Sequence, residues 1–270
     1  MRFRLHILLI ILVLLSSCGE YQKLLKSTDF ELKKSKVKEY YDEGQYVKTT
    51  EILTQILPRF RATAEAEDLN WMNAQSYYGM KDYFMAGSYF KSFIDQFPFG
   101  KHAEEAYYMA AECDYIISTR PELDQESTRN AIDGFNIFLN RFPNSAKAED
   151  CRKRINDLED KLVEKSYLSA KLYYDMKQYK AAVVALTNSL KEYANTKYRE
   201  KMMYLKLNSL FLYAEFSLAN KQKERYQATL DDYYSFMEEF PKSTYSKDVS
   251  DIYQKTDKFL KAGIPDSGVK

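Results

Sequence analysis

Residues 71–98 read WMNAQSYYGMKDYFMAGSYFKSFIDQFP, which is two apolar stripes separated by a polar turn. Trp71, Ala74 and Tyr78 recur at three and four residues, so they share one face of a helix. A Lys-Asp turn follows, and a second stripe with helical spacing begins after it. The stripe stops at Pro98, because proline has no N–H with which to continue a helix. The stretch therefore predicts two short antiparallel helices.

The same pattern recurs along the chain. Tyr41, Tyr78 and Tyr115 stand 37 residues apart, and so do Tyr167 and Tyr204. One helical hairpin cannot bury its own apolar face, so copies must stack on one another. The aromatic, small-residue and Phe-Pro signature is typical of the tetratricopeptide repeat (TPR). The sequence predicts an all-α fold, a TPR-like α-solenoid of about five helical hairpins closed by a C-terminal capping helix.

The first residues resemble a bacterial lipoprotein signal. Residues 1–17 form a signal peptide of two arginines and an apolar stretch too short to cross a bilayer. They end in Leu-Ser-Ser before Cys18, which resembles a lipobox, in which the cysteine is lipidated with chains such as palmitate. An ordinary signal peptide with a chance cysteine and a short anchor helix are the alternatives. By the same resemblance, Gly19 after the cysteine indicates the inner leaflet of the outer membrane, with the body facing the periplasm.

Repeat spacing and composition divide the rest of the chain. The charged stretch after the third hairpin keeps apolar residues at helical spacing, which predicts one long linker helix with a solvated, ion-paired face. The predicted parts are a lipid-anchored tether (18–29), N-terminal TPR repeats 1–3 (30–148), the linker helix with repeats 4–5 and the capping helix (149–262), and a disordered tail (263–270).

The composition argues against several functions. Lys and Arg number 40 and Asp and Glu 39, so no overall positive field would attract nucleic acid. Beyond the signal peptide the one histidine is His102, and no His/Cys cluster or catalytic motif surrounds it, so we expect no metal, no cofactor and no enzymatic activity. Cys113 and Cys151 are either two buried free thiols or a disulfide between neighbouring repeats.

Taken together, these features resemble one family. The lipobox, the hairpins, the insertion of residues 118–128 in the third hairpin and the charged linker helix occur in this order in the BamD/ComL family, lipoproteins of the outer-membrane β-barrel assembly (BAM) machine. The most specific local match is Arg120, Asp124-Gln125 and Thr128 ahead of an Ala-x-x-x-Phe helix. The chain departs from the pattern at Ala194, which replaces an expected proline.

The resemblance implies a binding protein that promotes β-barrel insertion. The three N-terminal repeats would bind the C-terminal segment of unfolded outer-membrane β-barrel proteins. The two C-terminal repeats would dock on the POTRA domains of a BamA-like protein, alongside other BAM subunits. Tyrosines at the groove positions could equally well pack between helices. The TPR positions expected to line the substrate-binding groove are Lys34, Lys38, Tyr41, Trp71, Gln75, Tyr78, Tyr108, Glu112 and Tyr115.

Two other functions fit the sequence less well. Another periplasmic TPR scaffold lipoprotein, acting in cell-envelope or division complexes, would show the same hairpins and the same anchor. A glycan-binding lipoprotein of the SusD-like class is also TPR-based, but it would need a much longer chain with large insertions between the repeats. A pull-down that recovers BamA would separate the assembly function from the scaffold function.

Overall fold

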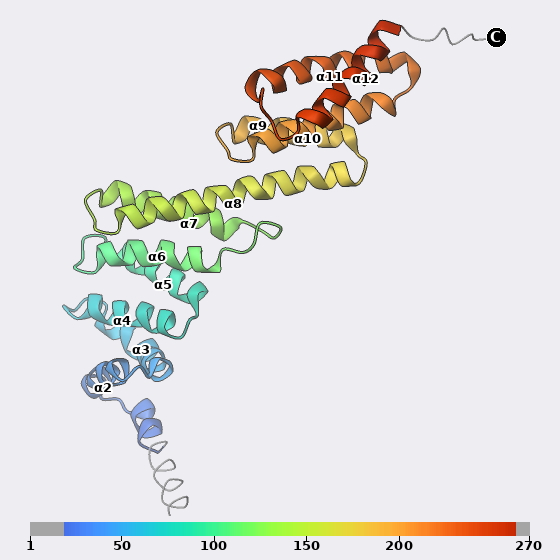
Figure 1. The fold of residues 1–270 in the computed structure, drawn as a ribbon. Helices are drawn as coiled ribbons and strands as arrows, with labels where there is room; N and C mark the ends of the chain where they lie inside the picture. The colour runs from blue at the N-terminus through green and yellow to red at the C-terminus, as the bar shows by residue number, and fades with distance from the viewer. Residues whose placement is uncertain (1–18, 263–270) are drawn as a thin grey trace, which may run out of the picture. The chain divides into compact units, whose positions relative to one another are not determined.

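The computed structural model describes residues 19–262, and helices are the only regular secondary structure in that range. Figure 1 shows these helices arranged as successive hairpins, so the predicted all-α, TPR-like fold is confirmed. The predicted signal peptide, Cys18 and the C-terminal tail lie outside the described residues. The helices are α2 (Phe30–Asp42), α3 (Tyr46–Phe60), α4 (Ala66–Gly79), α5 (Tyr83–Gln96), α6 (Ala103–Ile117), α7 (Glu126–Arg141), α8 (Ala148–Asp175), α9 (Tyr179–Glu192), α10 (Arg199–Glu215), α11 (Ala219–Glu239) and α12 (Ser246–Ala262).

Three of the hairpins share one turn geometry. Gly44, Lys81 and Lys177 each follow the first helix of a hairpin and have positive φ, 72°, 62° and 60°. Each donates its backbone N–H to a carbonyl three residues back, at 2.9 Å, and the next residue donates to a carbonyl five residues back. This paired arrangement is a Schellman motif, which satisfies the carbonyls that the end of a helix leaves free.

The chain divides into two compact units. Within the described range, the first contains residues 19–118 and 126–155, and its core is rich in aromatic and small side chains such as Phe90, Phe93 and Ala111. Gly134 of α7 lies so close to Ala111 of α6 that an added Cβ would be 2.9 Å from the alanine Cβ. Small residues thus allow the two helices to approach closely.

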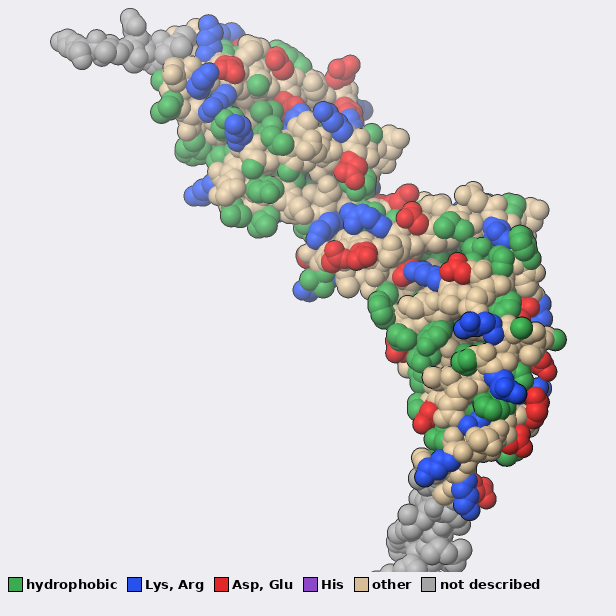
Figure 2. Space-filling model, turned by 180° about the vertical axis from the view of Figure 1, so that it is seen from behind, with side chains coloured by type: hydrophobic (Ala, Val, Ile, Leu, Met, Phe, Trp, Pro, Cys, Tyr) green, Lys and Arg blue, Asp and Glu red, His purple; other side chains and the backbone are tan. Residues whose placement is uncertain are grey.

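The second unit contains residues 119–125 and 156–262. Its core joins Val163 and Tyr167 of α8 to Leu186 of α9 and Met202 of α10, and a further cluster joins α10, α11 and the terminal helix α12. Lys165 of α8 donates hydrogen bonds to the carbonyls of residues 122 and 123, at 2.9 and 2.8 Å, which ties the insertion loop to this unit. Hydrophobic side chains also reach the surface of both units (Figure 2).

The segment expected to be a tether is structured for most of its length. Residues 19–26 form a helix, here called the leading helix, and Tyr21 and Leu24 on it are buried against the first hairpin. The prediction of a tether missed this packing, because a segment of eight residues shows barely two turns of apolar spacing. No helix within residues 19–262 has the length and apolar run needed to cross a bilayer.

Candidate functional site

The predicted groove residues of the first hairpin are exposed or partly buried. Lys34 pairs with Glu31 at 2.7 Å and with Glu65 at 3.0 Å, and its ammonium lies 4.9 Å from the centre of the Phe60 ring. Lys38 is exposed. The Tyr41 ring meets that of the turn residue Tyr46 edge-on at 6.1 Å, and the burial of Tyr41 raises the pKa of its phenol. These side chains remain accessible at one edge of the hairpin.

In the second hairpin the predicted residues mostly pack against neighbouring helices. The Trp71 ring stacks on His102, with centroids 4.6 Å apart and an interplanar angle of 1°, and it also contacts Phe90 and Phe93. Tyr78 meets Tyr83 edge-on at 5.3 Å, and Gln75 is partly buried. Both aromatic positions therefore contribute to the core as well as to any groove.

The third hairpin supplies the best-defined part of the predicted site, in which three of the nine residues surround Arg154 of α8. The Arg154 guanidinium forms ion pairs with Glu112 and, at 2.6 Å, with Asp150. It also lies 4.6 Å from the centre of the Tyr115 ring and 5.9 Å from that of Tyr108. We call these five residues the Arg154 cluster. It joins α6 to the start of α8.

Burial sets the charge states in the Arg154 cluster. Desolvation raises the pKa of the Glu112 carboxyl, and the positive charge of Arg154 opposes that rise. Desolvation, together with the nearby Glu112 carboxylate, raises the pKa of the Tyr108 phenol well above its ordinary value. The phenol therefore stays protonated and donates a hydrogen bond to Asp150 at 3.2 Å. The ammonium of Lys147 lies 4.2 Å from the Tyr108 ring centre, so the cluster presents rings flanked by cations.

Sequence reasoning missed Arg154, because it lies in the charged run that we expected to be a solvated face. The intrahelical pair with Asp150 agrees with that expectation, whereas the pairing with Glu112 of α6 does not. A signal was present. Arg154 comes three residues after Cys151 and four before Leu158, and both of these are buried. An arginine at that spacing lies beside the packed face of the helix.

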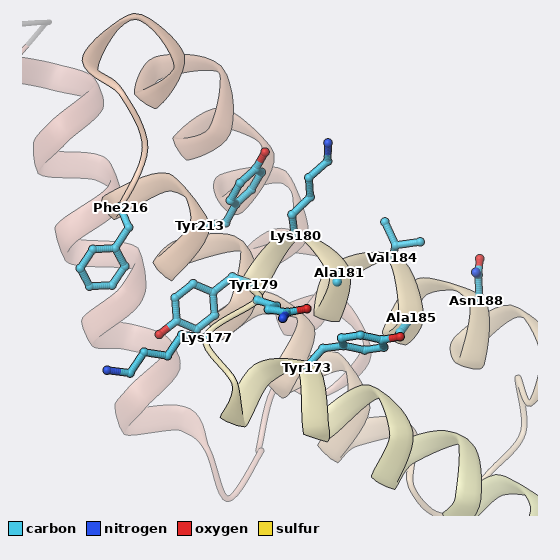
Figure 3. Close-up of a pocket in the computed structure, with 11 residues that line it drawn as sticks. Tyr173, Lys177, Tyr179, Lys180, Ala181, Val184, Ala185, Asn188, Tyr213 and Phe216 are labelled. Atoms are coloured by element: carbon cyan, nitrogen blue, oxygen red, sulfur yellow. The ribbon is translucent and has the colours of Figure 1, made fainter.

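A hollow in the second unit lies between the end of α8, the start of α9 and the end of α10 (Figure 3). Its volume is about 920 Å³. The rings of Tyr179 and Phe216 stack at 6.0 Å on one side of it. The residues that line this C-terminal hollow are Tyr173, Lys177, Gln178, Tyr179, Lys180, Ala181, Val184, Ala185, Asn188, Tyr213 and Phe216.

The C-terminal hollow combines exposed apolar side chains with positive charge. Phe216 is 74% exposed and Val184 54% exposed. Exposed apolar side chains that line one hollow together are typical of an interaction surface. The side chains of Lys177 and Lys180 extend at its rim (Figure 3), and neither has an ion-pair partner within residues 19–262. Such a hollow suits an apolar side chain of a partner that carries acidic neighbours.

No group of three or more His, Cys, Asp or Glu side chains that could hold a metal ion occurs among the residues placed by the structure. Cys113 and Cys151 are free and buried, so of the two alternatives the free thiols are observed. Burial raises the pKa of the Cys113 thiol to about 12 and that of the Cys151 thiol to about 11, which suppresses the reactive thiolate.

Comparisons with known proteins point to one family of outer membrane lipoproteins. The YfiO family model, described as an outer membrane lipoprotein, matches residues 33–212. The outer membrane protein assembly factor BamD of Rickettsia prowazekii is 23% identical over 171 residues, 63% of this chain and 68% of that protein. BamD of Haemophilus influenzae is 24% identical over 199 residues, 70% and 76% of the two chains. Among solved structures, the TPR domain of P58(IPK) aligns with 89% of this chain and 68% of its own, at 13% identity and a TM-score of 0.41.

Proposed function

Because the chain belongs to the YfiO family of outer membrane lipoproteins, we propose that it is a non-enzymatic subunit of the BAM complex that promotes insertion of β-barrel proteins. The observation that carries the proposal is the family match across residues 33–212, which spans most of the hairpins. The two relatives named as BamD support it. A helical-hairpin array offers extended surfaces for binding other chains, and this is how it would act.

The first unit would bind unfolded outer-membrane proteins. The terminal strand of a β-barrel alternates apolar and polar residues and carries aromatic residues at the membrane interface. The Arg154 cluster offers the rings of Tyr108 and Tyr115, which suit an aromatic side chain of the substrate. Arg154 and Lys147 hold these rings in place and are themselves paired with Glu112, Asp150 and Glu105. Lys34, Lys38 and Tyr41 would extend this surface along the first hairpin.

The second unit would dock on the POTRA domains of a BamA-like protein. The C-terminal hollow supports this assignment, because exposed apolar side chains and unpaired lysines occur together there. Stable interfaces are centred on buried apolar or aromatic anchors with polar residues around them. We expect the partner to place an apolar side chain near Val184 and Phe216 and acidic residues near Lys177 and Lys180.

A matched pair of substitutions tests the docking site. Val184→Asp places a charge in the C-terminal hollow, and Val47→Asp places the same charge on another exposed valine, 67% accessible, of the first hairpin. The tagged protein should co-purify with BamA, and Val184→Asp should lower the recovered BamA at least tenfold, while Val47→Asp should leave it unchanged. Equal recovery of BamA with both variants would show that the C-terminal hollow is not the docking site.

Co-purification also distinguishes the alternative function. If cell-wall or division proteins were recovered with the tagged chain and BamA were absent, the protein would be a different periplasmic scaffold lipoprotein.

The anchor requires its own test. We propose that Cys18 carries the lipid and holds the protein in the inner leaflet of the outer membrane. Cys18→Ser should leave the precursor uncut and abolish the mass shift of the acylated N-terminal peptide. Processed protein that still sediments with membranes after this substitution would contradict lipidation at Cys18.

A further inference from the structure

The leading helix is fixed to the first hairpin by several independent contacts. Tyr21 and Leu24 are buried in the same cluster as Val37 of α2 and Ile52 of α3. The Tyr21 hydroxyl donates a hydrogen bond to the Glu51 carboxylate. Burial and this carboxylate raise the pKa of the phenol, so it remains a donor at neutral pH. The leading helix therefore belongs to the folded unit.

A buried lysine closes this attachment. Lys33 of α2 is 3% exposed, and its ammonium donates to the Leu25 carbonyl at 3.0 Å and to the Gln55 side-chain oxygen at 2.5 Å. Leu25 is near the end of the leading helix, where carbonyls lack partners within the helix and a positive charge is favourable. Lys33 thus fastens the C-terminal end of the leading helix to α2.

This attachment restricts the position of a lipid on Cys18. A flexible tether of about twelve residues would let the folded part move roughly 20 Å from its anchor. The described part of the leading helix instead includes Gly19, and consecutive Cα atoms are about 3.8 Å apart. If Cys18 carries the lipid, helical residues of the first unit come within one residue of it, and the leading helix lies at the depth of the lipid headgroups.

Three lysines of this region form what we call the basic face. Lys23 and Lys26 are exposed on the leading helix. The ammonium of Lys48 on α3 lies 5.3 Å from the Tyr21 ring centre and 5.0 Å from that of Tyr40, which places it beside the leading helix. None of the three has an ion-pair partner in the part of the chain that the structure covers. Lys and Arg side chains are visible at this N-terminal end in Figure 2.

Two of the acidic residues nearby already have partners in the first hairpin and the leading helix. Glu39 pairs with Lys36 at 2.6 Å, and Glu20 acts on the same lysine, whose pKa both carboxylates raise. Glu51 accepts the hydrogen bond from Tyr21. The basic face therefore keeps positive charge that is free to meet an anionic group.

We propose that the basic face rests on the membrane and contacts the phosphates of anionic lipid headgroups, so that the first hairpin is held against the bilayer in one orientation. This inference rests on the proposed lipidation of Cys18 and is independent of BamA. A lysine close to an anionic membrane surface favours binding by about fivefold. Three such lysines together would favour membrane binding by on the order of a hundredfold, which is enough to orient a protein that its lipid already anchors.

Amine labelling of the acylated full-length protein tests the proposal. The protein is placed in vesicles of phosphatidylcholine alone or with about one third phosphatidylglycerol, and the labelling rate of each lysine is measured by mass spectrometry. We expect Lys23, Lys26 and Lys48 to react at least threefold more slowly in the anionic vesicles. Lys38 and Lys153, which are exposed elsewhere on the first unit, serve as controls and should not change.

A second variant separates orientation from simple proximity. Lys33→Met keeps the alkyl chain but removes the ammonium, so it should release the leading helix and abolish the protection of Lys48 while the protein still floats with the vesicles. Uniform protection of all exposed lysines, or equal labelling rates in the two kinds of vesicle, would refute the proposed contact between the basic face and anionic lipid. If the N-terminal peptide of the native protein is found to be unacylated, Cys18 carries no lipid, and this inference fails together with the proposed anchor.

Discussion

Replacing Arg154 with methionine is the sharpest test of how the third hairpin is held. Methionine keeps the apolar stem that packs beside α6, but it removes the positive charge that Glu112 and Asp150 share. Glu112 would then be a largely buried carboxylate with no cation bonded to it. We expect Arg154→Met to destabilise the first unit and to disturb the orientation of the Tyr108 and Tyr115 rings.

The expected loss follows from the burial of the pair. Breaking a fully buried ion pair by removing one partner costs about 3–5 kcal/mol. The Arg154 and Glu112 side chains are 21% and 13% exposed, so solvent screens part of the interaction. The exposed ion pair with Asp150 adds only a few tenths of a kcal/mol to this loss. A loss of about 2 kcal/mol in the free energy of unfolding is therefore expected.

The loss should depend on pH in a defined direction. The pKa of Glu112 is raised in the folded protein, chiefly by desolvation, while Arg154 lowers it, so removing Arg154 must raise it further. A carboxyl whose pKa is higher folded than unfolded binds its proton more tightly in the folded state. It therefore opposes folding above its folded pKa and ceases to do so as the pH falls towards the ordinary glutamate value of 4.5. The defect of Arg154→Met should be full at neutral pH and shrink on acidification.

Urea unfolding and hydrogen exchange together measure this effect. Because the chain has two units, a single transition is not guaranteed, so exchange of the α6 and α8 amides identifies where the loss occurs. Arg154→Met is compared with Arg154→Met/Glu112→Gln at about pH 7.5 and about pH 5. The double variant should recover most of the loss at the higher pH. If the double variant is as unstable as the single one, or if the defect is the same at both pH values, the buried carboxylate does not cause it.

Three further outcomes are expected. Lys81→Gly should raise stability by about 0.5 kcal/mol in urea unfolding, because the positive φ of 62° strains a residue with a Cβ; a loss of stability would contradict this. Gly134→Leu should lower stability by about 1–3 kcal/mol, and Ala111→Gly should recover part of it, because the two helices nearly touch there. Cys113 and Cys151, whose pKa values burial raises to about 12 and about 11, should resist thiol reagents at about pH 8 until the protein is unfolded, and rapid labelling of the native protein would refute that.

Local signals in the sequence account for the hairpins. The stripe of residues 71–98 corresponds to α4 and α5, and its polar Lys-Asp pair forms the turn. Spacing at three and four residues and a proline stop are properties of the backbone, so they can be predicted without knowing the neighbours. Gly44 favours a left-handed conformation at the end of its helix, and Lys81, at the equivalent position of the next repeat, adopts the same conformation.

Contacts made across helices could not be predicted in the same way. No local pattern distinguishes Lys33 from a surface lysine, because its burial depends on where the leading helix and Gln55 meet it. Arg154 was hidden within a charged run, and only its packing against α6 distinguishes it from its neighbours. The C-terminal hollow combines residues of three helices, so no single stretch of sequence signals it.

The tyrosine that follows the turn of a hairpin packs differently in the two units, and this difference bears on their proposed roles. In the first unit, the ring of the turn tyrosine Tyr46 lies over Gly79, where an added Cβ would clash with it, so the gap between hairpins is closed. In the second unit, the corresponding Tyr179 stacks on Phe216, which is itself 74% exposed, and the gap remains open as the C-terminal hollow. An open apolar hollow favours a lasting partner that can fill it, whereas the partly buried rings and cations of the Arg154 cluster suit weaker, exchangeable segments. This difference in packing supports our proposal that a permanent partner docks on the second unit and passing substrates bind the first.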